Sequence, residues 1–221
     1  MTDRPLGPLG WLRREDPRSE AYPMYAYLPD PLTVSYPTSK YWKTPPALSQ
    51  IGNSCVGYSS RTDLEAAPVE VPANVGPNGS LIYQEAQKRD GLPLPHEGTS
   101  LVAAGQYLKQ AGFWSTYVWA QSIDDIIKWV LLKGPVILGT VWCAGMDAYD
   151  SQYVIHPTGA VRGGHAYGLV GYDQKSGYFL VKNTWGRSWA NLGRVHLFWK
   201  DAEDLVFRRA GEAVAPTEPG M

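Results

Sequence analysis

The sequence predicts an α+β fold in which a helical half is followed by an antiparallel β half. From residue 53 to residue 133, apolar residues recur at helical spacing. After Gly134 and Pro135, short segments rich in Val, Tyr, Phe and Leu alternate with turns that carry Gly, Asp or Ser, which is typical of strands. The 221 residues suffice for one domain or two small lobes with a substantial core.

The first part of the chain, residues 1–46, is rich in Pro, Tyr and charge. The spacing of its prolines excludes long helices. Its aromatic residues argue against free disorder, which is usually poor in aromatics. We therefore expect an extended arm that lies along the surface of the domain.

A helical lobe is expected over residues 47–133. Its clearest helix is "SIDDIIKWVLLKG", where apolar residues follow helical spacing from Ile123 to Leu131. Ser122 and Asp125 are placed as a capping box, and Gly134 ends the pattern. Weaker helical patterns are "TSLVAAGQYLKQAG" and "SLIYQEAQKRDG".

An antiparallel β lobe is expected over residues 134–210, with a meander between residues 161 and 199. The expected strands are "VILGTVW", "HAYGLVGYD", "GYFLVKNTW" and "GRVHLFW". Residues 211–221 have no pattern, so we expect a flexible tail.

Composition excludes several classes of function. Twenty basic and 21 acidic residues leave a net charge of −1 without a basic stripe, so no nucleic-acid partner is expected. The apolar runs are shorter than the ~20 residues of a membrane span. The start has no apolar signal segment, so a cytoplasmic location is expected. Two cysteines provide neither a disulfide framework nor zinc spacing, so no metal is expected.

One of these cysteines, Cys55, follows a Gly-Asn-Ser turn in "SQIGNSCVGYSS". Asn53 and Ser54 are good helix caps, so the thiol is expected at a helix N-terminus. The first-turn N–H groups lower a thiol pKa there, which favours the nucleophilic thiolate. The alternative is that Cys55 is a small buried apolar residue.

A histidine and an asparagine follow in "GGHAYGLVGYDQKSGYFLVKNTWGRSW". A hairpin with its turn at "DQKSG" brings His165 and Asn183 to the same end of two paired strands. The Asn side-chain oxygen could then orient the imidazole, with Trp185 and Trp189 excluding water. Singly, a strand-end histidine and a turn asparagine are the simpler interpretations; together they indicate a catalytic pair.

This pattern resembles the papain-like cysteine peptidases. "QIGNSC" is similar to the family's nucleophile segment, "GGHAYGLVGYD" to its histidine strand and "VKNTWGRSW" to its Asn-Ser-Trp-Gly block. "KGPVILGTV" and "EGTSLVAAGQYLKQAG" are similar to the first strand of its β lobe and to one wall of its cleft. The resemblance implies two lobes, the helical one packed against a β-barrel-like one, with a cleft between them. It covers about residues 42–199.

The resemblance implies a role for each site residue. Cys55 would be the nucleophile, His165 the acid and base, Asn183 the orienting residue and Gln50 the oxyanion donor. The substrate would be a peptide or protein, and no cofactor is implied. The backbones of Gly98 and Gly164 would pair with an extended peptide, and Trp185 would shield the catalytic pair.

Several departures from the family pattern point to a compact, disulfide-free member of prokaryotic or phage type. The usual Cys-Gly-Ser before the nucleophile is Gly-Asn-Ser, and Val56 replaces an aromatic residue. Gln50 lies one residue closer to the cysteine than usual. Cys55 and His165 are 110 residues apart in the sequence, against roughly 130–150 in the papain group.

The favoured hypothesis is a cysteine-type endopeptidase that works through a Cys-His-Asn triad and a thioester. The alternative is a catalytically silent module that assembles into a larger particle, such as a phage virion, through its N-terminal arm. A weaker third hypothesis is a cell-wall amidase with similar chemistry.

Overall fold

The computed structural model describes residues 7–16, 21–30 and 32–217. Its centre is an antiparallel sheet with the order β2-β7-β3-β4-β5-β6, and β1 pairs with β4 beside this path. The strands are β1 (Ser39–Tyr41), β2 (Thr116–Trp119), β3 (Val136–Cys143), β4 (Val161–Asp173), β5 (Tyr178–Lys182), β6 (Arg194–Phe198) and β7 (Glu212–Thr217). The expected meander is confirmed by the pairing of β4 with β5 and of β5 with β6.

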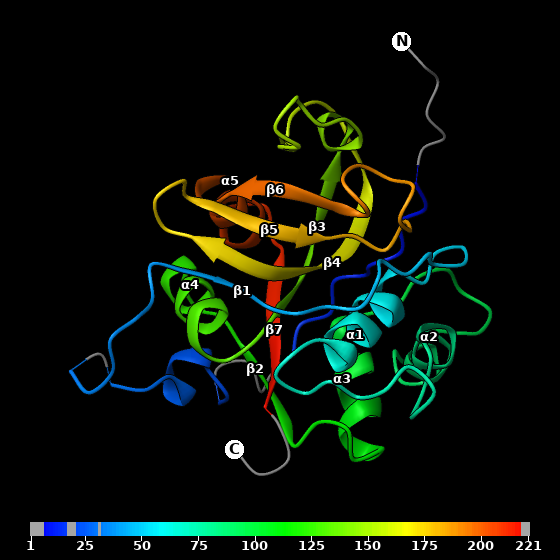
Figure 1. The fold of residues 1–221 in the computed structure, drawn as a ribbon. Coiled ribbons are helices and arrows are strands. Elements are labelled where there is room, and N and C mark those ends of the chain that lie inside the picture. Colours follow the sequence, from blue (N-terminus) through cyan, green and yellow to red (C-terminus); the bar gives the residue numbers. More distant parts are fainter. Residues whose placement is uncertain (1–6, 17–20, 31, 218–221) are drawn as a thin grey trace.

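The helices cover the two sides of this sheet (Figure 1). They are α1 (Cys55–Glu65), α2 (Gly79–Gln87), α3 (Leu101–Gln110), α4 (Ile123–Leu132) and α5 (Trp199–Glu203). Short 3₁₀ turns span Met24–Tyr27 and Ala144–Asp147, and a π-helical turn spans Asp204–Arg208. The α4 helix has the predicted Ser122–Asp125 capping box. None of the helices in the described ranges is long and apolar enough to cross a membrane.

Two apolar cores result from the alternation of side chains along the strands. One core joins α1, α2 and α3 to the strand residues Ile137, Ala166 and Val214. The other joins α4 and α5 to the opposite faces of the same strands, including Leu138 and Tyr167. Because strand side chains point alternately to the two faces, β3, β4 and β7 contribute to both cores.

Helix α1 is the element that carries the candidate nucleophile, and it is enclosed almost entirely. Nine of its eleven residues are buried. Gly57 allows α2 to approach closely, since a Cβ there would clash with the carbonyl oxygen of Gly79. The buried Arg61 donates to the carbonyls of Pro72, Val75 and Pro77, which fixes the following loop.

The structure corrects the expectation for the C-terminal tail. Residues 212–217 form β7, which lies between β2 and β3 instead of fraying. The segment looked patternless because a strand buried on both faces has no polar alternation, and Pro216 reads as a strand breaker. Residues 218–221 lie outside the described residues.

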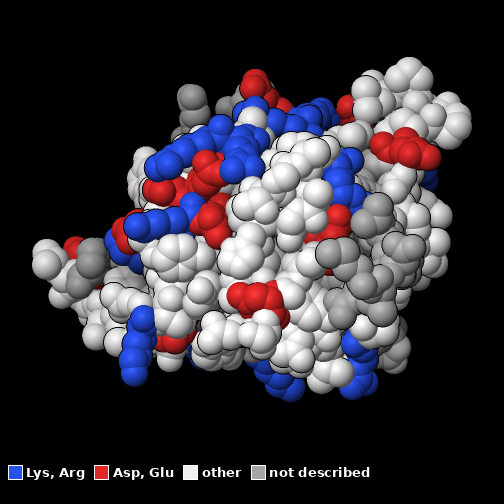
Figure 2. Space-filling model, turned by 90° about the horizontal axis from the view of Figure 1, so that it is seen from above, with Lys and Arg blue, Asp and Glu red and all other residues white. Residues whose placement is uncertain are grey.

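The boundary between the expected lobes also differs from the observed packing. The expected helical segment 47–133 includes β2, which pairs with β7, and α4, whose buried face joins the core of the sheet. The arm contributes β1 to the sheet, and its residues 1–6, 17–20 and 31 lie outside the described part. On the face shown in Figure 2, basic and acidic side chains are interspersed.

The position of β7 leads to a stability prediction. Val214→Ala should lower the free energy of unfolding by roughly 2 kcal/mol, because it removes buried methyl groups and leaves a cavity. The matched control is Val161→Ala on β4, where the side chain is 59% exposed and the change should stay below about 0.5 kcal/mol. Urea unfolding of both variants checks this, and equal losses would contradict the placement of β7.

Candidate active site

Cys55 is the first residue of α1, as the sequence predicts, and its side chain is fully buried. Its sulfur accepts the backbone N–H of Ala166 at 3.4 Å. Ala166 lies on β4 directly after His165, so this contact holds the start of α1 against the histidine strand. The fold thus joins two segments 111 residues apart at the thiol.

His165 and Asn183 meet as the hairpin argument predicts. The imidazole Nε2 lies 2.7 Å from the Asn183 side-chain oxygen, and both side chains are buried. That oxygen also accepts the N–H of Thr184, so we assign it as an acceptor and Nε2 as the protonated nitrogen. The other ring nitrogen, Nδ1, is buried without a hydrogen-bond partner. It therefore keeps a free lone pair with which to take a proton.

Burial controls the charge of this pair. It raises the pKa of the Cys55 thiol to about 12, against smaller opposing effects from the backbone N–H groups of Ala166, Val56 and Cys55 itself. It lowers the pKa of His165 to about 4, although the bond to Asn183 opposes this shift. Burial therefore favours a neutral thiol and a neutral imidazole, unlike the low-pKa thiolate expected from the helix position alone.

Aromatic side chains enclose the imidazole. The Trp185 ring lies 5.0 Å from His165, and Trp189 packs against Trp185 at 5.2 Å. Trp142 on β3, which sequence analysis missed, meets the imidazole edge-on at 4.9 Å. Trp142 reaches the imidazole because β3 pairs with β4 in a register that sets Thr140 opposite His165. The sequence of one strand does not reveal which residues of a distant strand it pairs with, so this contact could not be predicted.

Gln50 is 8% exposed and lies just before the nucleophile helix. Its amide nitrogen donates to the carbonyl of Gly52 at 2.7 Å, and its oxygen accepts the hydroxyl of Thr184 at 2.5 Å. Gly52 takes a positive φ of 56°, the tight turn that the shortened spacing requires. The Gln50 side chain is thus fixed next to the loop that follows Asn183, and Thr184 is a supporting residue that sequence analysis missed.

The most unexpected feature is the path of the arm. Residues 7–12 run between the helical half and the sheet (dark blue in Figure 1), where Trp11 is buried and Pro8 stays exposed. The N–H groups of Gly10 and Trp11 both donate to the carbonyl of Gly164, at 2.8 and 2.9 Å. A Cβ at Gly10 would clash with the Asn53 carbonyl, so only glycine fits this close approach.

Both sides of the arm segment are engaged. On the helical side, the N–H of Thr99 donates to Gly10 and its carbonyl accepts from Leu12, at 3.0 and 2.9 Å. At the other end, the indole N–H of Trp185 donates to the carbonyl of Pro8 at 2.9 Å. The arm therefore covers the start of α1 with the hydrogen bonds of an added strand.

This pairing bears on the expected substrate-binding residues. Gly164 and Trp185 both bond the arm, but Gly98 does not. The N–H of Gly98 donates instead to the hydroxyl of Tyr83 at 3.1 Å, and Thr99, one residue later, presents the pairing edge. Which residue of an irregular loop pairs with the arm depends on the side chains that anchor the loop. The motif "EGTS" does not reveal these anchors.

Trp11 anchors the arm in the core of the helical half. Its ring is 6% exposed, lies against Gly139 and Gly164, and belongs to the same apolar cluster as Cys55. Its indole N–H donates to the Glu212 carboxyl at 2.7 Å. Burial raises the pKa of Glu212 to about 8, and the bond from Trp11 partly offsets this shift.

No group of three or more His, Cys, Asp or Glu side chains in the described residues is placed to hold a metal ion. The second thiol, Cys143, is also buried, at the end of β3.

The arm should control access to the thiol. Trp11→Ala should speed alkylation of Cys55 at least tenfold, because loss of a buried Trp costs roughly 3–5 kcal/mol and each 1.4 kcal/mol is about a factor of ten. The rate is measured with iodoacetamide on chains that also carry Cys143→Ser. Leu32→Ala, which removes a 93% exposed side chain from the same arm, is the control and should change nothing. Equal rates in all three chains would exclude arm control.

Glu212 should make stability depend on pH. Its pKa is about 8 in the folded chain against an ordinary value of 4.5, so between these values the folded chain holds a proton that the unfolded chain releases. The free energy of unfolding should therefore fall as pH rises through this window. Glu212→Gln cannot titrate, so its unfolding midpoints between about pH 5 and pH 8 should fall less steeply. Parallel slopes for both proteins would contradict the assignment.

Comparison with known proteins agrees with this architecture. The sequence model described as papain family cysteine protease matches residues 94–205, just over half of the chain. The chain is similar to the cathepsin B-like cysteine proteinase 5 of Caenorhabditis elegans, with 30% identity over 144 residues (62% of this chain, 42% of the relative). It is also similar to cathepsin B-like CP3 of Giardia intestinalis, with 34% identity over 126 residues (56% and 38%). The matches span less than half the length of these relatives.

Solved structures share the fold. The crystal structure of xylellain, a cysteine protease from Xylella fastidiosa, matches with a TM-score of 0.74 and 17% identity, covering 99% of both chains. The digestive procathepsin L2 proteinase of Tenebrio molitor matches with a TM-score of 0.64 and 22% identity, covering 96% of this chain and 78% of that one. These likenesses confirm the predicted papain-like two-lobe α+β fold. Together with the family match, they show that this chain belongs to the papain family of cysteine proteases.

Proposed function

We propose that this chain is a cysteine-type peptidase in which Cys55, His165 and Asn183 form the catalytic triad. The observation that carries the proposal is the state of the imidazole. One ring nitrogen of His165 is hydrogen-bonded to Asn183, and the other has no hydrogen-bond partner. The next residue, Ala166, donates its N–H to the thiol sulfur. A nucleophile, a base and an orienting group in this order are what acyl transfer by a thiol requires.

The reaction follows from these positions. His165 takes the thiol proton at Nδ1, and the Cys55 sulfur attacks the peptide carbonyl. The N–H of Cys55 and the Gln50 amide hydrogen that is not bonded to Gly52 stabilise the oxyanion. The protonated imidazole then gives its proton to the leaving amine, which leaves a thioester on Cys55. A water molecule, deprotonated by His165, hydrolyses the thioester and restores the thiol.

The arm supports an extended peptide as the substrate. It binds through backbone groups of Thr99, in the connection before α3, and of Gly164, on β4. Backbone pairing of this kind accepts many sequences, and the side-chain sites supply the preference. A peptide substrate would use the same groups after the arm leaves.

The enzyme is latent while the arm is in place. Trp11 of the arm packs in the same apolar cluster as Cys55, and burial keeps both the thiol and the imidazole uncharged. Release of the arm admits water, which lowers the pKa of the thiol and raises that of the imidazole, so that proton transfer between them becomes easier. The procathepsin L2 among the similar structures carries a precursor name, which supports a covered form for this chain as well.

The proposal predicts how hydrolysis responds to substitution. In 221-residue chains that carry Trp11→Ala, a peptide library should be cleaved, and Cys55→Ala should abolish cleavage. Gln50→Ala should lower kcat by roughly 10²–10³ while Cys55 still reacts with iodoacetamide, as expected for loss of one oxyanion donor. Cys143→Ser is the matched thiol control and should retain full activity. A Trp11→Ala chain whose Cys55 is alkylated but which cleaves no peptide would favour a catalytically silent module.

A further inference from the structure

We propose that Asp90 is a positioning residue that holds Thr99 in place as the edge on which a peptide substrate pairs. The inference rests on the proposed function, since it takes the arm as a stand-in for the substrate. Asp90 touches neither the arm nor the thiol through any hydrogen bond in the described structure, so its effect passes through Thr99.

Thr99 is the only residue of the helical half, within the described ranges, whose backbone pairs with arm residues 7–12 in the manner of a strand. It uses both its N–H and its carbonyl, with Gly10 and Leu12 as partners. The bridge between Trp11 and Thr99 is parallel and isolated, so no neighbouring ladder supports it. The position of Thr99 must therefore be fixed by other contacts.

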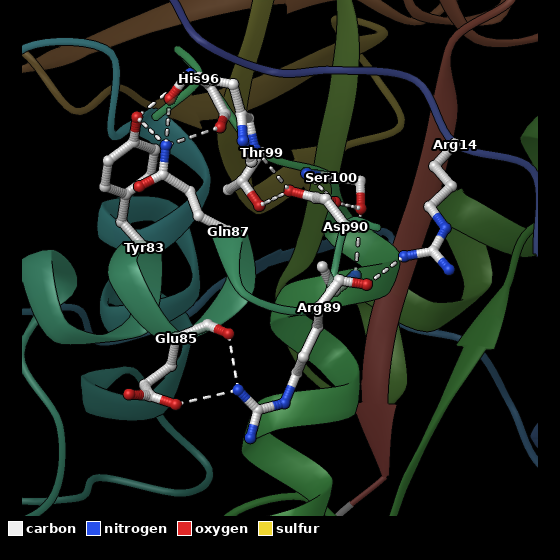
Figure 3. Close-up of polar contacts among 11 residues, drawn as sticks. Arg14, Tyr83, Glu85, Gln87, Arg89, Asp90, His96, Thr99 and Ser100 are labelled. Carbon is white, nitrogen blue, oxygen red and sulfur yellow. Dashed lines mark hydrogen bonds and ion pairs between the residues drawn. The ribbon is translucent and has the colours of Figure 1, made fainter. Parts of the chain in front are cut away.

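Secondary structure does not fix it. The connection between α2 and α3, residues 88–100, is irregular. A loop of this length usually moves unless side chains anchor it. Its anchors here are polar and come from α2 and the residues that follow it (Figure 3).

Asp90 provides the central anchor. One carboxylate oxygen accepts the Thr99 hydroxyl at 2.5 Å, and the other accepts the Ser100 hydroxyl at 2.6 Å and its N–H at 3.3 Å. The side chain is 3% exposed, so water does not compete for these bonds. The Nε2 atom of His96 lies 3.5 Å from the same carboxylate.

Two neighbouring side chains hold the rest of the loop. The Tyr83 hydroxyl accepts the N–H of Gly98, and the Gln87 amide donates to that hydroxyl and to the carbonyl of His96. Ser100, which Asp90 holds, is also the N-cap of α3 and accepts the N–H of Ala103. Asp90 thereby couples the substrate edge to the start of a buried helix.

Because of this arrangement, binding of long substrates depends on Thr99, and binding of short ones does not. A peptide long enough to reach Thr99 gains two backbone hydrogen bonds from an edge that is already in place. A small ester that ends near Cys55 gains none of them. Loss of the Asp90 carboxylate should therefore weaken binding of long peptides and spare the chemical step.

The test uses 221-residue chains that carry Trp11→Ala, which frees the site without removing the arm. Asp90→Asn should raise KM for a hexapeptide five- to tenfold and leave kcat within twofold. It should leave kcat/KM for a single-residue ester unchanged. Thr99→Val should reproduce the defect, and Thr99→Ser, which keeps the hydroxyl, should restore near-parental values. Glu85→Gln on α2 is the matched control, because that carboxylate pairs with Lys88 and Arg89 at the start of the loop and with neither Thr99 nor Ser100.

A second measurement needs no catalysis. In the chain with its natural arm, Asp90→Asn should speed hydrogen exchange of the Leu12 amide, whose N–H donates to Thr99, while Glu85→Gln should not. Equal losses on the hexapeptide and the ester, or unchanged Leu12 exchange, would overturn the proposal and reduce Asp90 to a residue needed for folding. If the Trp11→Ala chain cleaves nothing, the proposed function fails, and Leu12 exchange alone decides the role of Asp90.

Discussion

The pairing of β4 with its neighbours is the constraint on which the remaining structure depends. This strand bonds β3 and then β1 along one edge, and β5 along the other. Its two faces enter both apolar cores, through Ala166 and Tyr167. Because its register is set at so many points, the carbonyl of Gly164, the imidazole of His165 and the N–H of Ala166 have fixed directions toward the arm, Asn183 and the thiol.

Burial determines the acidity of the thiol and of the imidazole in this site. A thiol at the start of a helix is usually more acidic than a free cysteine, because the first-turn N–H groups stabilise its anion. Here desolvation outweighs that effect, since the arm and the aromatic enclosure exclude water from both partners. The same atoms would behave differently with water present, so reactivity is set by what covers the site as much as by the residues that form it.

The sequence predicted most of what depends on local pattern. Helical spacing identified α4 with its Ser122 cap, and turn chemistry identified the β4–β5 hairpin that joins His165 to Asn183. It could not predict contacts made across the fold. Trp142 and Thr184 support the site through strand register, and Thr99 replaces Gly98 as the pairing edge because of its anchors. The path of residues 7–12 was missed because proline and aromatic content describes an extended chain without saying where it lies.

The bond between Trp11 and Glu212 joins residues 201 positions apart. Glu212 belongs to β7, which lies between β2 and β3, so β2 lacks a partner strand, and β3 lacks one of its two, until this strand is in place. Contacts of such long sequence separation form late in folding, after the entropy of closing the intervening loop has been overcome. The lobes must therefore assemble before the arm can dock on Glu212. A growing chain on the ribosome thus contains the thiol segment before it contains Glu212, the partner of the Trp11 indole.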